Sequence, residues 1–224
     1  HSTWSLHSTK IERSIYGRSI IVLNKICAIF SKEPDAILFV SKAGMNSHIS
    51  YGYENSNMLI INNGYDLNKF YSDDTLRNEF RSKNAISSDV FTIGCIGRMH
   101  PAKDHDNLFA ALSKIKYKLG KFIIVMAGSG IESNNCELMK LIEVYGLTEN
   151  VKLLGEQSNM CAVYNMLDIF VLSSYTEAFP NVLVEAMSCQ LPCVTTDAGD
   201  ARLIINNENY VVPVRNADCL ANVV

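Results

Sequence analysis

The sequence predicts an α/β protein whose core is a parallel β-sheet, and three observations lead to that fold class. From residue 91 onward, six short apolar segments of strand length alternate with segments that have the 3.6-residue period of amphipathic helices. Strands that alternate with helices form parallel sheets packed against helices. Most glycines of this part of the chain follow an apolar segment, at the strand ends where such sheets bind ligands. The composition, 48% hydrophobic and 19% charged, is that of a globular protein.

The first ninety residues predict a smaller piece of the same architecture, followed by a linker. Its expected elements are a helix over 11–30, a strand over 35–41, a helix over 42–51 and a strand over 58–61. The second strand ends at the turn sequence Asn62-Asn63-Gly64. Residues 71–90 are rich in Ser, Asp and Arg, with Leu76 and Phe80 four residues apart. This segment predicts a linker that contains a short helix.

The larger part of the chain predicts six strands with helices between them. The strands are expected at 92–96, 122–126, 151–154, 168–172, 191–195 and 210–212. Asp104 or Asp106 is expected to cap the first helix, which Gly120 ends, and Ser158 to cap a later short helix. The remaining helices are expected before Gly146, over 181–189, near 200–205 and at the end of the chain.

The segment 173–200 places two carboxylates beside a candidate anion site. Pro180 suits the first turn of the helix over 181–189, and a helix N-terminus attracts phosphate through its unpaired N–H groups. Glu185 shares a helix face with Asn181, and Glu177 precedes the helix. Carboxylates beside a phosphate site are consistent with a ligand whose ribose and sugar hydroxyls donate hydrogen bonds to them. The alternative is a structural Glu185 paired with a cation and a solvated Glu177.

A second candidate site follows the strand over 92–96. Arg98 stands directly after Gly97, and Lys103 lies at the entrance of the next helix. Two cations at one sheet edge neutralise a diphosphate and the charge that develops as it leaves. The alternative is a pair of solvated surface cations. The nearby Asp104-His105-Asp106 has the D-x-D spacing of a metal site, but both aspartates suit a helix start, so we predict no metal.

These residues resemble a known enzyme family. Glu177 and Glu185 have the E-x7-E spacing of retaining glycosyltransferases of the GT-B fold, and 173–200 as a whole resembles glycosyltransferase family 4, also called group 1. Gly97 to Lys103 resembles the G-R-x-x-x-x-K motif of that family. The resemblance implies two facing Rossmann-like domains and transfer of a sugar, of the hexosyl type, from a nucleotide-diphosphate donor with retention.

The resemblance also implies roles for individual residues. Arg98, Lys103 and Glu177 would be catalytic. The implied donor-binding residues are Gly97, Gly128, Ser129, Phe179, Pro180, Asn181, Val182 and Glu185. Gly128 and Ser129 belong to a G-S-G turn that a plain strand-to-helix connection would also explain. The chain departs from the family pattern at Ala178, Gln190 and Asp200, where Gly is common.

The same resemblance divides the chain and predicts that it is a fragment. Residues 1–70 would be the C-terminal part of the acceptor domain, 71–90 the linker, and 91–224 the donor-binding domain, truncated at its C-terminus. We expect such a fragment to bind nucleotide without transferring sugar, because most of the acceptor domain would lie upstream. The segment 95–105 resembles bacterial enzymes of surface polysaccharide or lipopolysaccharide biosynthesis, which implies a saccharide or lipid-linked acceptor.

Charge and cysteine content indicate which partners and which cellular location to expect. A net charge of −3 without a basic block disfavours nucleic acid as a partner. Seven cysteines without a C-x-x-C pair predict reduced thiols in a cytoplasmic protein, at the inner membrane face if the upstream domain binds peripherally. No cofactor is expected besides the donor substrate. A nucleotide-sugar epimerase, a phosphorylase of the same fold and a non-catalytic nucleotide-sugar-binding module remain alternatives.

Overall fold

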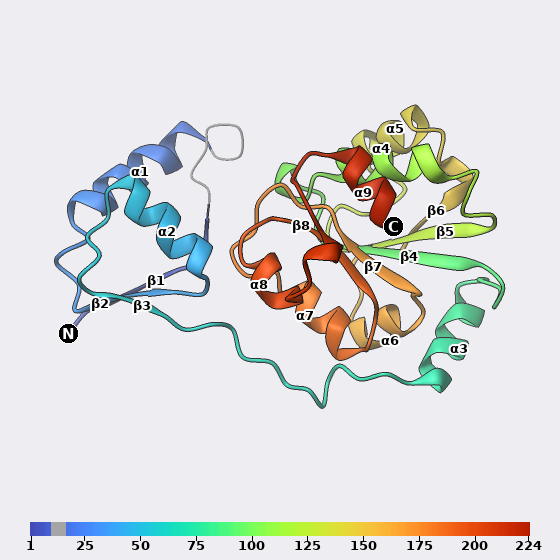
Figure 1. The fold of residues 1–224 in the computed structure, drawn as a ribbon, viewed down its shortest axis with the longest axis horizontal. Helices are drawn as coiled ribbons and strands as arrows, with labels where there is room; N and C mark the ends of the chain where they lie inside the picture. Colours follow the sequence, from blue (N-terminus) through green and yellow to red (C-terminus); the bar gives the residue numbers. More distant parts are fainter. Residues whose placement is uncertain (10–16) are drawn as a thin grey trace.

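The computed structural model of the chain describes residues 1–9 and 17–224, which form a small and a large α/β domain (Figure 1). The small domain contains β1 (Thr3–Leu6), α1 (Arg18–Ile29), β2 (Ala36–Phe39), α2 (Lys42–Tyr51) and β3 (Met58–Ile60). Its three strands are parallel, with β2 in the middle. Ile37 and Phe39 of β2 pack with Tyr53 in a small core, and α1 and α2 lie on one face of the sheet.

An extended segment leads from β3 to the large domain, and a helix fastens its far end there (Figure 1). This helix is α3 (Asp74–Lys83), capped by Asp73, within the region predicted as a linker with a short helix. The Arg77 guanidinium donates to the Asp168 carboxylate at 2.5 Å, and Arg81, 4% exposed, donates to the same carboxylate at 3.4 Å. α3 is therefore held to the large domain through buried polar contacts.

The large domain is built on a six-stranded parallel sheet, among the residues that the structure describes. Its strands are β4 (Phe91–Ile96), β5 (Phe122–Ala127), β6 (Val151–Leu153), β7 (Ile169–Leu172), β8 (Cys193–Thr196) and β9 (Val211–Val212). Their order, β6-β5-β4-β7-β8-β9, is that of the doubly wound Rossmann arrangement. The chain reverses direction across the sheet between β4 and β7, so their carboxyl ends flank the crevice where such sheets bind ligands.

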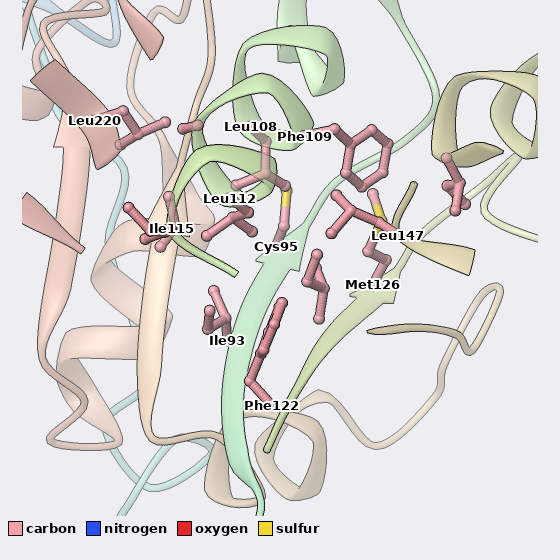
Figure 2. Close-up of a cluster of buried hydrophobic side chains, with 14 of the residues drawn as sticks. Ile93, Cys95, Leu108, Phe109, Leu112, Ile115, Phe122, Met126, Leu147 and Leu220 are labelled. Atoms are coloured by element: carbon pink, nitrogen blue, oxygen red, sulfur yellow. The ribbon is translucent and has the colours of Figure 1, made fainter. Parts of the chain in front are cut away.

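Helices cover both faces of this sheet (Figure 1). One face carries α4 (His105–Ile115), α5 (Cys136–Val144) and α9 (Ala217–Val223), and the other carries α3, α6 (Met160–Asn165), α7 (Asn181–Ser188) and α8 (Ala201–Ile205). In Figure 2, Ile93 and Cys95 of β4 face Leu108 and Leu112 of α4. Short 3₁₀ turns complete the connections at Pro101–Lys103, Thr148–Asn150 and Glu208–Tyr210.

The structure confirms the predicted alternation of strands and helices and differs from the prediction at element ends. β1 lies in a segment for which no element was predicted, because its four residues become a strand only by pairing with β2. The predicted helix over 11–30 is observed as α1, and its first predicted residues, 11–16, lie outside the described residues. α4 ends at Ile115, five residues before Gly120.

Several predicted caps are also corrected. Asn159 caps α6 with its side-chain oxygen, whereas Ser158 does not, because Asn159 is the residue that reaches the Ala162 amide. Asp104 takes the N-cap position of α4 in a left-handed conformation, and its side chain makes no capping bond. Pro180 is the N-cap of α7 and not a residue of its first turn. α7 buries Leu183 and Ala186, although most of its residues are apolar.

Candidate active site

The carboxyl end of β4 delivers the predicted cations to the crevice. The chain leaves the sheet at Gly97, whose N–H bonds the Ala127 carbonyl at 2.9 Å. The side chain of Lys103 folds back over Gly97, where an added Cβ would lie 3.1 Å from the Lys103 Cε. A glycine at this position leaves room for the lysine stem. Arg98 is exposed at the same edge.

Lys103 and Glu177, predicted from motifs 74 residues apart, meet directly. The Lys103 Nζ lies 2.6 Å from the Glu177 Oε1, and the two side chains are only 19% and 13% exposed. Ser174 donates to the same carboxylate oxygen at 2.6 Å. The loops that carry the pair are also joined, because the Tyr175 N–H bonds the Ala102 carbonyl at 2.8 Å. The ion pair is thus held in one geometry by both loops.

The G-S-G turn after β5 lies against the Arg98 loop. Gly128 has a φ of +140°, and an added Cβ would stand 2.4 Å from the Gly97 carbonyl oxygen. Only glycine fits there without moving backbone. The Ser129 carbonyl accepts the Met99 N–H at 2.7 Å, and the Ser129 side chain is exposed at the surface. The structure therefore brings Gly97, Arg98, Gly128 and Ser129 together.

The N-terminus of α7 supplies the second predicted cluster. Pro180 has no side-chain oxygen with which to cap the first turn, where Asn181 and Val182 begin the helix. One turn on, Glu185 accepts the Tyr164 hydroxyl at 2.7 Å through Oε2. Burial, together with the charge of Glu185, raises the pKa of Tyr164 well above its ordinary value. Tyr164 is a neutral donor that fixes one oxygen of Glu185.

Residues that the sequence did not predict form the wall opposite the cations. The segment after β1 brings His7, Ser8 and Thr9 to a cavity of about 190 Å³ that is also lined by Arg98, His100, Lys103 and Glu177. The Thr9 hydroxyl donates to the Glu177 carbonyl and lies 3.3 Å from the Thr176 hydroxyl. His7 to Thr9 follow the carboxyl end of β1, and residues at that end of a parallel strand lie where such sheets bind ligands. Because β1 was not predicted, this wall was missed as well.

A second unpredicted contact comes from the segment that follows β3. The Tyr65 hydroxyl and the Asn63 amide donate to the Asn181 side-chain oxygen at 2.5 and 2.7 Å. The Tyr65 ring stacks on Phe179, with ring centroids 6.2 Å apart. Burial, then the Glu185 charge, raises the pKa of Tyr65 to about 12. The predicted donor residues Phe179 and Asn181 therefore also contact the chain between the domains.

The D-x-D sequence at the start of α4 has structural roles. The Asp106 carboxylate accepts the Tyr145 hydroxyl at 2.9 Å, and Asp104 ends the preceding 3₁₀ turn. In the described ranges, no three His, Cys, Asp or Glu side chains are grouped so that they could hold a metal ion. The helices in the same ranges are too short or too polar to cross a bilayer.

Comparisons with known proteins agree on one family. The family model described as "Glycosyl transferases group 1" matches residues 77–224. Among curated proteins, the putative glycosyltransferase EpsF of Bacillus subtilis is 29% identical over 65% of this chain and 37% of its own length. The yeast phosphatidylinositol N-acetylglucosaminyltransferase GPI3 subunit (Saccharomyces cerevisiae) is 33% identical over 58% of the chain and 29% of its own length. The chain thus spans well under half the length of these two relatives.

A solved structure extends the likeness to the fold of both domains. HepE of Anabaena, crystallised with UDP-glucose, superposes with a TM-score of 0.86 at 20% identity. The match covers 99% of this chain and 60% of HepE. Because the match includes the small sheet as well as the large one, the predicted α/β fold of GT-B type is confirmed.

Proposed function

We propose, because this chain belongs to the group 1 glycosyltransferases, that it forms the donor side of a retaining enzyme of family 4. Its substrate would be a nucleotide-diphosphate sugar, and its reaction the transfer of a hexosyl group with retention at the anomeric carbon. The observation that carries this proposal is the partly buried Lys103–Glu177 pair, which joins the loops after the neighbouring strands β4 and β7 and lines a cavity together with His7 to Thr9 of the small domain.

The side chains at the crevice fit the parts of such a donor. Arg98 and Lys103 would neutralise the charge that develops on the leaving diphosphate. Lys103 is partly buried and already held by Glu177, so it would need little reorganisation during the reaction. The backbone N–H groups at 180–182, with Gly97, Gly128 and Ser129 nearby, would hold phosphate oxygens. No metal is needed in this arrangement, because cations and a helix N-terminus supply the positive field.

The two carboxylates would orient the hydroxyl groups of the donor. Lys103 and Ser174 hold one oxygen of Glu177, which would present the other to the donor sugar. Glu185, fixed through Tyr164, would accept the ribose hydroxyls in the same way. Phe179, Asn181 and Val182 would complete the pocket. Nothing in this scheme uses a protein nucleophile, so catalysis would rest on positioning and charge stabilisation.

We further propose that residues 1–70 belong to the acceptor domain and that 71–90 lead into the donor domain of 91–224. The His7 to Thr9 wall would then face the acceptor, a saccharide or lipid-linked molecule of surface polysaccharide or lipopolysaccharide biosynthesis. Such an enzyme would work in the cytoplasm, at the inner membrane face. The GPI3 relative, whose name describes transfer to phosphatidylinositol, supports a lipid-linked acceptor. We expect the chain of 224 residues alone to bind donor without transferring it.

Calorimetric titration with UDP tests the donor site. Arg98→Ala should weaken binding by about 10- to 100-fold, the loss of a charge-assisted contact to phosphate. Arg18→Ala, which removes an exposed arginine at the start of α1, is the matched control and should leave affinity unchanged. Equal affinities for the wild type and Arg98→Ala would contradict the proposed role of Arg98.

A further inference from the structure

A carboxylate of the large domain binds the small domain. Asp200, between β8 and α8, is 4% exposed, and its two oxygens accept separate backbone N–H groups. Oδ2 accepts the Lys42 N–H and Oδ1 the Ala43 N–H, both at 2.8 Å. These donors belong to the first turn of α2, 157 and 158 residues earlier in the chain.

The chemistry of both partners explains why this contact forms. The first N–H groups of a helix have no partner inside the helix, and the helix dipole favours a negative charge there. Ser41 is the N-cap of α2, and its side-chain hydroxyl accepts the Gly44 N–H at 2.9 Å. Among the described residues, Asp200 forms no ion pair, so the helix N-terminus is what compensates its buried charge. The Asp200 carboxylate thus accepts N–H groups that have no partner within α2, and these N–H groups in turn satisfy the buried carboxylate.

The same residue is joined to the loop that carries Glu177. The Asp200 N–H bonds the Ala178 carbonyl at 3.1 Å. Directly before it, Gly199 has a φ of +62°, and an added Cβ would lie 2.3 Å from the Glu177 carbonyl oxygen. The turn 199–200 is thus packed against the backbone of 177–178. A shift of α2 relative to the large domain would therefore displace Glu177.

We propose that Asp200 is a positioning residue that locks the N-terminus of α2 to the Glu177 loop. It holds the small domain against the donor crevice and fixes the position of Glu177 relative to Lys103. The lock itself stands on the observed bonds, whereas its effect on donor binding rests on the proposed function. The departure from the family pattern at position 200 thereby acquires a physical role.

Amide hydrogen exchange of the 224-residue chain, measured by NMR, tests the lock directly. Asp200→Ala should speed exchange at Lys42 and Ala43 by at least about tenfold, because both amides lose their acceptor. Gly44, which bonds Ser41, should keep its protection, and Ser41→Ala should give the reverse pattern. Asp89→Ala removes an exposed carboxylate paired with Lys121 and serves as the control. Unchanged exchange at Lys42 and Ala43 in Asp200→Ala would overturn the lock.

A second measurement needs no variant and decides the question if Asp200→Ala does not fold. In the wild-type chain labelled with ¹⁵N and ¹³C, the amide nitrogens of Lys42 and Ala43 should each show a scalar coupling through the hydrogen bond to the Asp200 carboxyl carbon. No such coupling at either amide would overturn the proposal. The Gly44 amide, whose acceptor is the Ser41 hydroxyl, should show no coupling to Asp200.

Donor affinity tests the positioning role separately. Asp200→Ala should lower affinity for UDP-glucose by at least about threefold, since Glu177 loses its fixed position, and should leave affinity for UDP unchanged. Asp200→Asn, which keeps one acceptor oxygen, should recover part of the loss. An equal loss for both ligands would reduce Asp200 to a stabilising residue. Failure of the wild type to bind any of UDP, ADP and GDP would instead contradict the proposed function, and amide exchange would still decide the lock.

Discussion

At the scale of single residues, the candidate site depends on side chains whose partners fix their orientation. Glu185 illustrates this, because its place one turn after Asn181 was predictable from helix spacing, whereas its bond to Tyr164 was not. Tyr164 belongs to α6, and only the packing of α6 against α7 brings the two together. Sequence spacing identified the candidate donor-binding carboxylate, and tertiary structure supplied the group that orients it.

Glu185→Ala should weaken binding of a nucleoside diphosphate by about 1–3 kcal/mol, because hydrogen bonds to a charged acceptor are lost. Glu185→Gln, which keeps one acceptor oxygen, should lose less. Calorimetry measures both, with Glu143→Ala on the exposed side of α5 as the control. If Glu185→Ala lowers stability and leaves affinity intact, the carboxylate is structural.

Two buried histidines make stability depend on pH. Burial lowers the pKa of His105 to about 4 and also lowers that of His48, so the fold favours their neutral forms. Their contribution is complete above the unfolded pKa of about 6.5 and is lost as the pH falls toward the folded value. For His105 this amounts to about 3 kcal/mol.

Urea unfolding between pH 7 and pH 4 measures this loss. His105→Gln should show a flatter dependence than the wild type over that range, because no buried imidazole remains to be protonated at that site. His1→Gln, at a fully exposed side chain, should follow the wild type. Parallel curves for all three proteins would show that His105 does not destabilise the fold on protonation.

At the scale of elements, the alternation of strands and helices from residue 91 was predictable because strands such as β4 and β5 are apolar and almost entirely buried. β1 was not, since Thr3–Leu6 alternates exposed and partly buried residues over only four positions. Thr9 and Tyr65 were also missed, because their partners lie 116 to 168 residues away. Local pattern predicts an element, whereas contacts of that range follow only from the topology.

The attachment of α3 gives a prediction about stability. Hydrogen bonds from Thr92 and Arg77 outweigh the effect of burial and hold the pKa of Asp168 below its ordinary value. Asp168→Ala would leave the guanidinium of Arg81 buried without its carboxylate, and we expect a loss of about 3–5 kcal/mol in the free energy of unfolding.

Denaturant unfolding compares this variant with Asp218→Ala, which breaks an exposed pair with Lys114. That control should cost less than about 1 kcal/mol. Similar costs for the two variants would mean that the contacts of α3 contribute no more than a surface pair.

At the scale of the whole molecule, the two domains meet where the predicted donor residues are. Thr9, Asn63, Tyr65 and the N-terminus of α2 all contact the loops around Glu177, Asn181 and Asp200. A nucleotide-diphosphate sugar in this crevice would lie between both sheets, with Arg98 and Lys103 beside its diphosphate. We propose that these cations and the N-terminus of α7 bind the diphosphate without a metal ion.

The melting temperature of the chain with UDP, ADP or GDP, in the presence of EDTA, tests whether the site binds a diphosphate without a metal ion. We predict that at least one of these nucleotides raises the melting temperature, because ligand that binds only the folded state stabilises it. The Arg98→Ala, Lys103→Ala double variant should abolish the rise, and the Arg18→Ala control should retain it. A rise that appears only when Mg²⁺ or Mn²⁺ replaces EDTA, or no rise with any of the three, would contradict metal-free binding of the diphosphate at this site.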